Sequence, residues 1–182
     1  MAQNAPETVI MAQDEAGLYL QSTTIAVWYQ RGQSPVVRVD PGRAKSCFYG
    51  SLNLLTGQVI AMQTPLMNAE VTAQYLRKIL EAYPDRPILI FWDRAPWHKG
   101  PAIRQLLEEH PRLELFFFPV ASPDLNPQEQ VWKATRNAVS HNHFVPRLAE
   151  LAQRFEDYLI SNFFPSSFLD RFGYNAIRPM FI

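Results

Sequence analysis

The sequence predicts an α/β fold in which a mixed sheet, part antiparallel and part parallel, carries helices on both faces. Strand-like segments fill the first third of the chain, and helical and strand-like segments alternate through the rest. The chain has 182 residues, of which 47% are hydrophobic, and no repeat, low-complexity tract or linker divides it. A chain of this size can bury one core, so we expect a single domain over residues 1–182.

The first half of the chain supplies the antiparallel part of the sheet. Residues 8–14, "TVIMAQD", are typical of a short strand that ends at Asp14. Residues 26–32 fit either a strand or a loop. Residues 44–63 divide at Gly57 into two strand-like halves, which is the pattern of a hairpin. We expect these pieces to pair with the first strand.

The pattern changes to helices that alternate with buried strands in the second half. Residues 68–84 have apolar side chains at helical spacing behind a candidate N-cap, Asn68. Residues 86–93, "RPILIFWD", are continuously apolar, as in a strand covered on both faces, and end at Asp93. The other expected elements are a helix over residues 100–111, a strand over 112–119, a helix over 126–142, and an amphipathic helix over 147–163 in a C-terminal helical extension (145–182). Residues 1–6 are expected to form a frayed tail.

Composition limits the function. Basic and acidic residues balance at 17 each, so no global positive field favours a polyanionic partner. A single cysteine, Cys47, excludes an internal disulfide and a cysteine-built zinc site, and its apolar surroundings predict an inert buried thiol. Neither a basic leader followed by a long apolar stretch nor a run of eighteen apolar residues occurs. We therefore expect a cytoplasmic protein that is neither exported nor membrane-spanning.

Three acidic residues follow three successive apolar strands. Asp14 and Asp93 come at the ends of their predicted strands, and Glu129 lies in the first turn of the helix after the next strand. In such sheets the carboxyl ends of neighbouring strands meet at one edge, where ligands bind. Three carboxylates brought together repel unless a cation neutralises them, and oxygen ligands favour Mg²⁺ or Mn²⁺. Two such ions support in-line displacement at phosphorus, which makes phosphodiester chemistry the leading hypothesis.

Each acid also has an ordinary structural explanation. Asp14 could open a turn, and Asp93 could cap the following loop. Glu129 stands three residues after Asn126, so it could complete a capping box or pair with Lys133 one turn later. Taken singly, each residue favours the structural explanation. Taken together, the order of the three acids favours a shared site.

Three motifs resemble one family. The segment "SPDLNPQEQVW" resembles the "SPDLNPIE..W" signature of DDE transposases in the mariner-like superfamily, in particular the bacterial insertion sequences of the IS-six-thirty group. "FWDRAPWHKG" resembles the "DNAxxH" stretch of that group, and "MAQDEAGLYL" resembles its first "xDE" segment. The motifs occur in the family's order, and 35 residues separate Asp93 from Glu129.

The resemblance implies a ribonuclease-H-like fold with a five-stranded sheet, in which Asp14, Asp93 and Glu129 hold two Mg²⁺ or Mn²⁺ ions. The implied activity is DNA cleavage at transposon ends followed by transfer of the 3′-hydroxyl into target DNA, by a homodimer or larger assembly associated with the nucleoid. Family members precede this core with a helix-turn-helix region, whereas only 13 residues precede Asp14 here. We therefore expect end recognition to come from a separate or fused DNA-binding region.

Other polar residues near these motifs are candidates for the site. Asp124 competes with Glu129 for the third position, but the family match favours Glu129. Glu15 is expected either behind the ligands or facing solvent. The candidate DNA contacts are Arg94, which stands where the family has Asn, His98, which the resemblance places near the scissile phosphate, and Lys99, Lys133 and Arg136. Solvated surface charge explains each lysine and Arg136 equally well.

Three rival hypotheses remain open at this stage. The chain could be an inactive or truncated transposase remnant that serves as a non-catalytic interaction module and binds no metal. It could be a ribonuclease-H-like nuclease that does not transpose, which would leave cleaved ends unjoined. A two-carboxylate glycosidase would hydrolyse sugars in the presence of a chelator.

Overall fold

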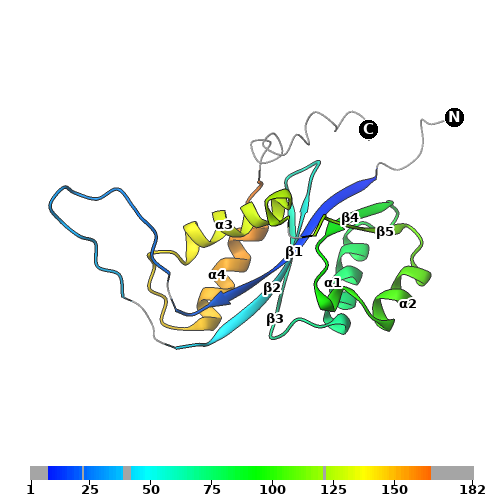
Figure 1. Ribbon diagram of the computed structural model, residues 1–182, viewed down its shortest axis with the longest axis horizontal. Helices are drawn as coiled ribbons and strands as arrows, with labels where there is room; N and C mark the ends of the chain where they lie inside the picture. Colours follow the sequence, from blue (N-terminus) through cyan, green and yellow to red (C-terminus); the bar gives the residue numbers. More distant parts are fainter. Residues whose placement is uncertain (1–7, 22, 39–41, 121, 165–182) are drawn as a thin grey trace.

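A computed structural model describes residues 8–21, 23–38, 42–120 and 122–164, which form a five-stranded sheet in the order β3-β2-β1-β4-β5 (Figure 1). The strands are β1 (Val9–Tyr19), β2 (Lys45–Asn53), β3 (Val59–Thr64), β4 (Ile88–Trp92) and β5 (Leu113–Phe117). β1, β2 and β3 pair antiparallel, whereas β4 and β5 run parallel to β1. The predicted mixed sheet is therefore confirmed.

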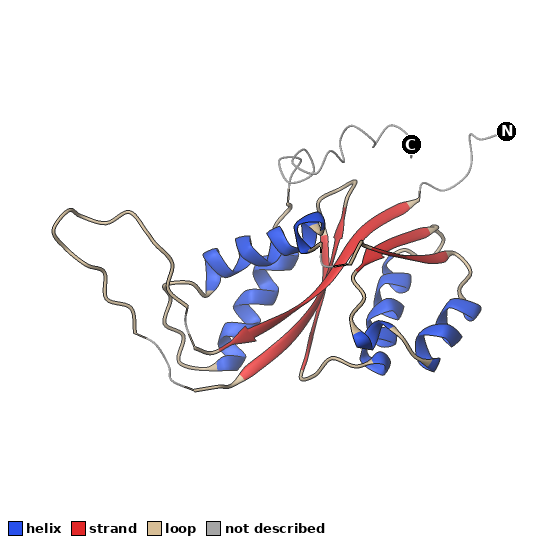
Figure 2. Cartoon of the chain, in the orientation of Figure 1, coloured by secondary structure: helices blue, strands red, loops and turns tan. Residues whose placement is uncertain are grey.

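Helices cover both faces of the sheet (Figure 2). The helices are α1 (Ala69–Ala82), α2 (Pro101–Glu109), α3 (Pro127–Val139) and α4 (Leu148–Ser161), with short 3-10 turns η1 (Pro96–His98) and η2 (Pro123–Leu125). One hydrophobic core lies between the sheet and α1 and α2, and a second lies between the sheet and α3 and α4. Within the described part of the chain, no helix has the length and apolar character needed to cross a membrane.

Sequence signals set several of these boundaries. Asn68 caps α1 as predicted, because its Oδ1 accepts a hydrogen bond from the backbone N–H of Val71 at 2.8 Å. Gly57 has φ +76° in the turn between β2 and β3, a conformation that glycine adopts without steric cost. The hairpin predicted at this position is confirmed.

The first strand is longer than predicted. It does not end at Asp14 but continues to Tyr19, because β2 pairs with it over its whole second half. Its parallel pairing with β4 stops earlier, at the pair Ala12 and Phe91. Asp14 and Asp93 each lie two residues beyond that last pair, so both stand at the same level of the sheet edge. The two carboxylates therefore reach the same edge although Asp14 lies within its strand.

Alternation along β1 sends its two acids to opposite faces. Ala12 and Ala16, on either side of Asp14, belong to the core beneath α3 and α4, whereas Met11 belongs to the core beneath α1 and α2. Successive side chains of a strand point to opposite faces. Asp14 consequently faces α3 and α4, and Glu15 faces α1 and α2.

β4 is less fully covered than its continuous apolar sequence predicts. Ile88, Ile90 and Trp92 are buried against α1 and α2, whereas Leu89 and Phe91 on the other face are only half-buried. The reason is that α3 and α4 lie over β1, β2 and β3 and leave the β4 end of that face more open.

A long loop joins β1 to β2 and extends away from the body of the protein (Figure 1). Residues 26–32 belong to this loop and form no strand, and the Trp28 side chain is fully exposed. Ile25 ties the base of the loop to the segment after α3, because its N–H and C=O bond the Asn142 side chain at 3.0 and 3.1 Å. The predicted N-terminal tail and residues 165–182 of the predicted C-terminal extension lie outside the described residues.

Candidate active site

Asp14, Asp93 and Glu129 line one pocket at the sheet edge, with a volume of about 300 Å³. The three residues come from β1, from the end of β4 and from the first turn of α3. Arg94, Phe118, Val120 and Asn126 are among the other residues that line it. Three of the sequence-predicted candidates thus meet in space, although up to 114 residues separate them along the chain.

Asp14 is held by the core beneath α3. The indole Nε1–H of Trp132 donates a hydrogen bond to Asp14 Oδ2 at 3.0 Å. Trp132 is 1% exposed and stacks near Phe155, with ring centroids 6.1 Å apart. Trp132 is therefore a core residue whose indole also fixes one oxygen of the Asp14 carboxylate.

Asp14 is partly buried next to other carboxylates. Burial raises the pKa of Asp14 well above its usual value, and the neighbouring charges of Glu129 and Glu15 raise that pKa further. The hydrogen bond from Trp132 opposes this shift without cancelling it. A bound cation would relieve the repulsion among these carboxylates, so the donor set fits a hard divalent ion.

Asp93 combines a capping role with access to the pocket. Its Oδ1 accepts a hydrogen bond from the backbone N–H of Ala95 at 2.8 Å, which is the loop cap expected from the sequence. Its side chain is nevertheless 54% exposed and lines the pocket. Capping and ligand binding are therefore compatible at this residue.

Asn126 fixes the start of α3 against β1. Its Oδ1 accepts from the Gln128 backbone N–H at 3.1 Å, and its Nδ2 donates to the backbone C=O of Gln13 at 3.0 Å. The backbone N–H of Asn126 donates to Pro123 at 3.0 Å, so it is not free for a capping box with Glu129. The "SPDLNP" turn thus anchors the helix that carries Glu129 next to the strand that carries Asp14.

Asp124 and Glu129 differ in their position relative to the pocket. Asp124 lies in η2 with an exposed side chain and does not line the pocket, whereas Glu129 does. The geometry therefore favours Glu129 as the third carboxylate.

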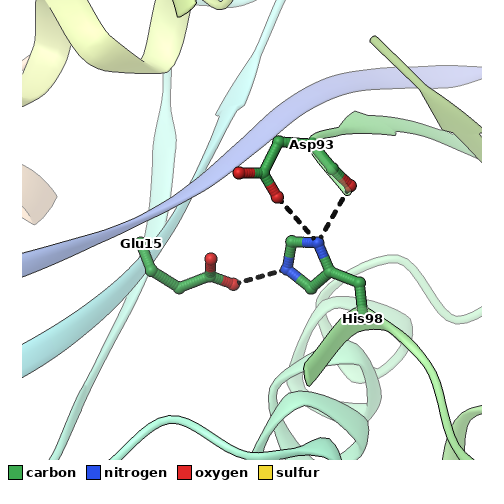
Figure 3. A group of neighbouring side chains, drawn as sticks. All are labelled: Glu15, Asp93 and His98. Atoms are coloured by element: carbon green, nitrogen blue, oxygen red, sulfur yellow. Dashed lines mark hydrogen bonds and ion pairs between the residues drawn. The ribbon is translucent and has the colours of Figure 1, made fainter. Parts of the chain in front are cut away.

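His98 is buried and contacts Glu15, a partner that the sequence did not predict (Figure 3). Its Nε2 is 2.8 Å from Oε1 of Glu15, and its Nδ1 is 3.0 Å from both the backbone oxygen and Oδ1 of Asp93. Burial alone would lower the pKa of His98, but the hydrogen bonds and charges of Glu15 and Asp93 outweigh burial and raise it. Because both ring nitrogens are engaged within the protein, the expected direct contact of His98 with a DNA phosphate is not supported.

Of the other four candidate DNA contacts, Arg94 lines the pocket and the other three do not. Arg94 also lies over the Phe117 ring, 4.9 Å from the ring centroid. Lys99 and Lys133 are exposed, and Arg136 Nη2 donates to the backbone oxygen of Gly17 at 3.5 Å. Contact of these side chains with DNA stays a prediction.

A mixed sheet of this strand order, with helices on both faces and acidic residues meeting at the edge between β1 and β4, defines the ribonuclease-H-like class of fold. The chain matches the family described as "DDE superfamily endonuclease" over residues 9–152, which is most of its length. It belongs to this family, as the three sequence motifs predicted.

Individual relatives agree with this assignment. The chain is 24% identical over 155 residues to the "Insertion element IS630 uncharacterized 39 kDa protein" of Shigella sonnei, and the match covers 84% of this chain and 45% of that relative. The chain thus spans less than half the length of this curated relative. Among solved structures, the catalytic domain of Mos1 mariner transposase superposes with a TM-score of 0.61 at 15% identity, over 94% of this chain and 76% of that one. The mariner Mos1 paired-end complex with Mg superposes with a TM-score of 0.67 at 17% identity, over 94% of this chain and 55% of that one.

Proposed function

We propose that this chain is the catalytic part of a transposase that cuts DNA at transposon ends and joins the freed 3′-hydroxyl to target DNA. The observation that carries the proposal is the meeting of Asp14, Asp93 and Glu129 in one pocket. Membership of the DDE endonuclease family supports the same chemistry.

The donor set supports Mg²⁺ or Mn²⁺ as the cofactor, with two ions as the proposed number. Carboxylate oxygens are the ligands these ions prefer, and the pKa of Asp14 is raised by burial first and then by the charges of Glu129 and Glu15, which an ion would neutralise. When bound, two such ions activate the attacking oxygen and stabilise the leaving oxygen of an in-line displacement. Solved structures of the Mos1 mariner paired-end complex carry Mg and Mn in their descriptions.

The protein's own contribution is to hold the three carboxylates in fixed positions. Trp132 donates to Asp14, the Ala95 backbone N–H donates to Asp93, and Asn126 ties the helix of Glu129 to β1. Such preorganisation lowers the barrier because the reacting groups need no rearrangement at the moment of reaction. Arg94, which lines the pocket, and Lys99, Lys133 and Arg136 are the candidate contacts for phosphates.

We also propose that the complete enzyme works on paired DNA ends as a homodimer or larger assembly, with a separate or fused helix-turn-helix region for end recognition. The names of similar structures, a paired-end complex and a strand transfer complex of Mos1 transposase, support action on paired DNA ends. This chain alone should bind DNA weakly and without sequence preference, because its basic and acidic residues balance.

Calorimetry with Mn²⁺, followed by a DNA cleavage and joining assay, tests the proposal. Asp93→Asn and Glu129→Gln should each abolish Mn²⁺ uptake and metal-dependent cleavage while circular dichroism shows an intact fold. Asp124→Asn is the matched control, since it removes a nearby exposed carboxylate that does not line the pocket.

The outcomes separate the rival functions. Cleavage without joining of the products to a second DNA would indicate a non-transposing nuclease. Wild-type protein that takes up no Mn²⁺ with or without DNA would contradict the proposal and favour an interaction module. Equal loss of metal binding in Asp124→Asn would overturn the assignment of the third ligand.

A further inference from the structure

Glu15 and His98 form a polar pair in contact with Asp93 (Figure 3). Glu15 follows Asp14 in β1 but points toward α1 and α2, and its side chain is only 4% exposed. Its Oε1 accepts hydrogen bonds from His98 Nε2 at 2.8 Å and from Gln13 Nε2 at 2.7 Å. A buried carboxylate with this many donors around it is held in one orientation.

His98 connects that buried carboxylate to Asp93. Its ring stacks on the indole of Trp92, with centroids 4.1 Å apart and an interplanar angle of 11°, and its side chain is fully buried. The stacking and the bond to Glu15 leave the imidazole one orientation, in which Nδ1 lies 3.0 Å from the backbone oxygen of Asp93, as a hydrogen bond, and 3.0 Å from its Oδ1, as an ion pair. Fixation of the ring therefore restrains both the backbone and the carboxylate of Asp93.

Asp93 needs such support more than Asp14 does. Its side chain is 54% exposed, so packing restrains it little, and its only other side-chain bond among the described residues is to Ala95. Carboxylates that bind metals are usually oriented by hydrogen bonds from residues that do not touch the ion.

We propose that Glu15 and His98 are positioning residues that hold the Asp93 carboxylate in its metal-binding orientation. This inference rests on the proposed function, because it assigns Asp93 as a ligand. It explains why the acid after Asp14 is buried, and why a histidine five residues after Asp93 has no access to solvent.

The same three residues could be regarded as a metal site of their own, because one ligand atom from each lies within 4.8 Å of the others. The geometry argues against that reading. His98 Nε2 and Glu15 Oε1 are in direct hydrogen-bond contact, and the second ring nitrogen is in contact with Asp93. An ion would have to break both contacts, whereas the pocket on the other side offers Asp93 two further carboxylates.

Substitutions at His98 provide a sharp test on the 182-residue chain. His98→Asn carries an amide that reaches the position of Nδ1 and can donate to Asp93, whereas His98→Gln carries one that reaches the position of Nε2 and can contact only Glu15. His98→Phe keeps the ring stacked on Trp92 and removes both nitrogens. We expect Mn²⁺ affinity, measured by calorimetry, to fall about 10–100-fold in His98→Phe and His98→Gln. His98→Asn should stay closer to wild type.

A double variant guards against misfolding. Substituting His98 alone removes one hydrogen-bond donor from the buried Glu15 carboxylate, which destabilises the fold. Glu15→Leu combined with His98→Phe replaces both partners by apolar groups, which proteins tolerate better. The double variant should fold, bind Mn²⁺ about 10–100-fold more weakly, and regain cleavage at saturating Mn²⁺. Asp93→Asn should not regain cleavage at any metal concentration, because the ligand itself is lost.

The possible results separate this inference from the proposed function. If Asp93→Asn abolishes Mn²⁺ binding while the double variant binds like wild type, the positioning role is refuted and the proposed function stands. If His98→Gln matches or exceeds His98→Asn in affinity, the contact with Asp93 is not the one that matters, and the inference also fails. If Asp93→Asn itself binds Mn²⁺ normally, the proposed function fails first and this inference with it.

Discussion

Gly50 is the residue at which a single added methyl group should damage both stability and the active site. Gly50 lies opposite Asp14 in the pairing of β1 with β2. A Cβ atom at this position would lie 2.4 Å from Cη2 of Trp132 and 2.7 Å from its Cζ2. Ordinary contact begins near 3.4 Å, so the indole in a Gly50→Ala variant must move by about 1 Å.

The surroundings of Trp132 make that movement costly. The ring is 1% exposed, stacks near Phe155 and donates to Asp14, so it cannot shift without disturbing a packed neighbour or the carboxylate. Overpacking of this kind costs about 1–3 kcal/mol of unfolding free energy. Because α3 carries both Trp132 and Glu129, a shift of about 1 Å should also reduce metal-dependent cleavage about 100-fold.

Urea unfolding followed by circular dichroism measures the first effect, and the cleavage assay measures the second. Gly17→Ala is the matched control, since its Cβ would meet only the ring of the exposed Tyr19 at 3.3 Å. That control should unfold within about 0.5 kcal/mol of wild type. Gly50→Ala that is as stable as Gly17→Ala and cleaves DNA normally would refute this account of how α3 is seated.

Three further substitutions test the electrostatics and packing of the described structure. Because the pKa of Asp14 is raised in the folded state, the metal-free protein should lose stability as the pH rises through that pKa. Asp14→Asn should therefore be more stable than wild type at neutral pH without metal, and as stable as wild type below about pH 3.8. Thermal unfolding in chelator across pH measures this, and a wild-type advantage at neutral pH would contradict it. Gln128→Leu should raise the unfolding free energy by about 1–2 kcal/mol, because both amide atoms of the buried Gln128 lack hydrogen-bond partners among the described residues. A lower unfolding free energy of this variant in urea would contradict the prediction. Arg112→Met should lower the unfolding free energy by about 1–3 kcal/mol, since the guanidinium donates to three backbone oxygens at and beyond the end of α1. Arg104→Met, on the exposed face of α2, should change the unfolding free energy little. Equal effects of the two substitutions in urea would argue against a stabilising role of the Arg112 hydrogen bonds.

The predicted pH dependence also links the site to its cofactor. Asp14 is destabilised as a carboxylate by burial and by the charges of Glu129 and Glu15. An ion that binds only the folded state stabilises it by mass action, so Mn²⁺ should reverse the order of wild type and Asp14→Asn at neutral pH. If the proposed function holds, the carboxylate cluster lowers stability in the absence of metal and provides affinity for the ion in its presence.

Local chemistry was sufficient to predict the hairpin and two helix starts, and it placed the three candidate carboxylates near the ends of apolar strands. Asn68 and Asn126 cap helices through bonds to residues two or three positions away, and Gly57 turns a hairpin through its own backbone. Interactions over such short distances along the chain can be predicted from neighbouring residues. The position of Glu129 followed likewise from the turn and cap that precede it, together with the resemblance of that segment to a known family.

Only the tertiary structure decided how far β1 extends and what the residues beside the carboxylates do. Acidic residues and a glycine after Ala12 are unfavourable in strands, and it is the pairing with β2 that carries the strand on to Tyr19. The partnership of Glu15 with His98 spans 83 residues, and that of Asp14 with Trp132 spans 118. No local pattern encodes such contacts, because they arise from the order of strands in the sheet and from the side of the sheet on which each helix packs.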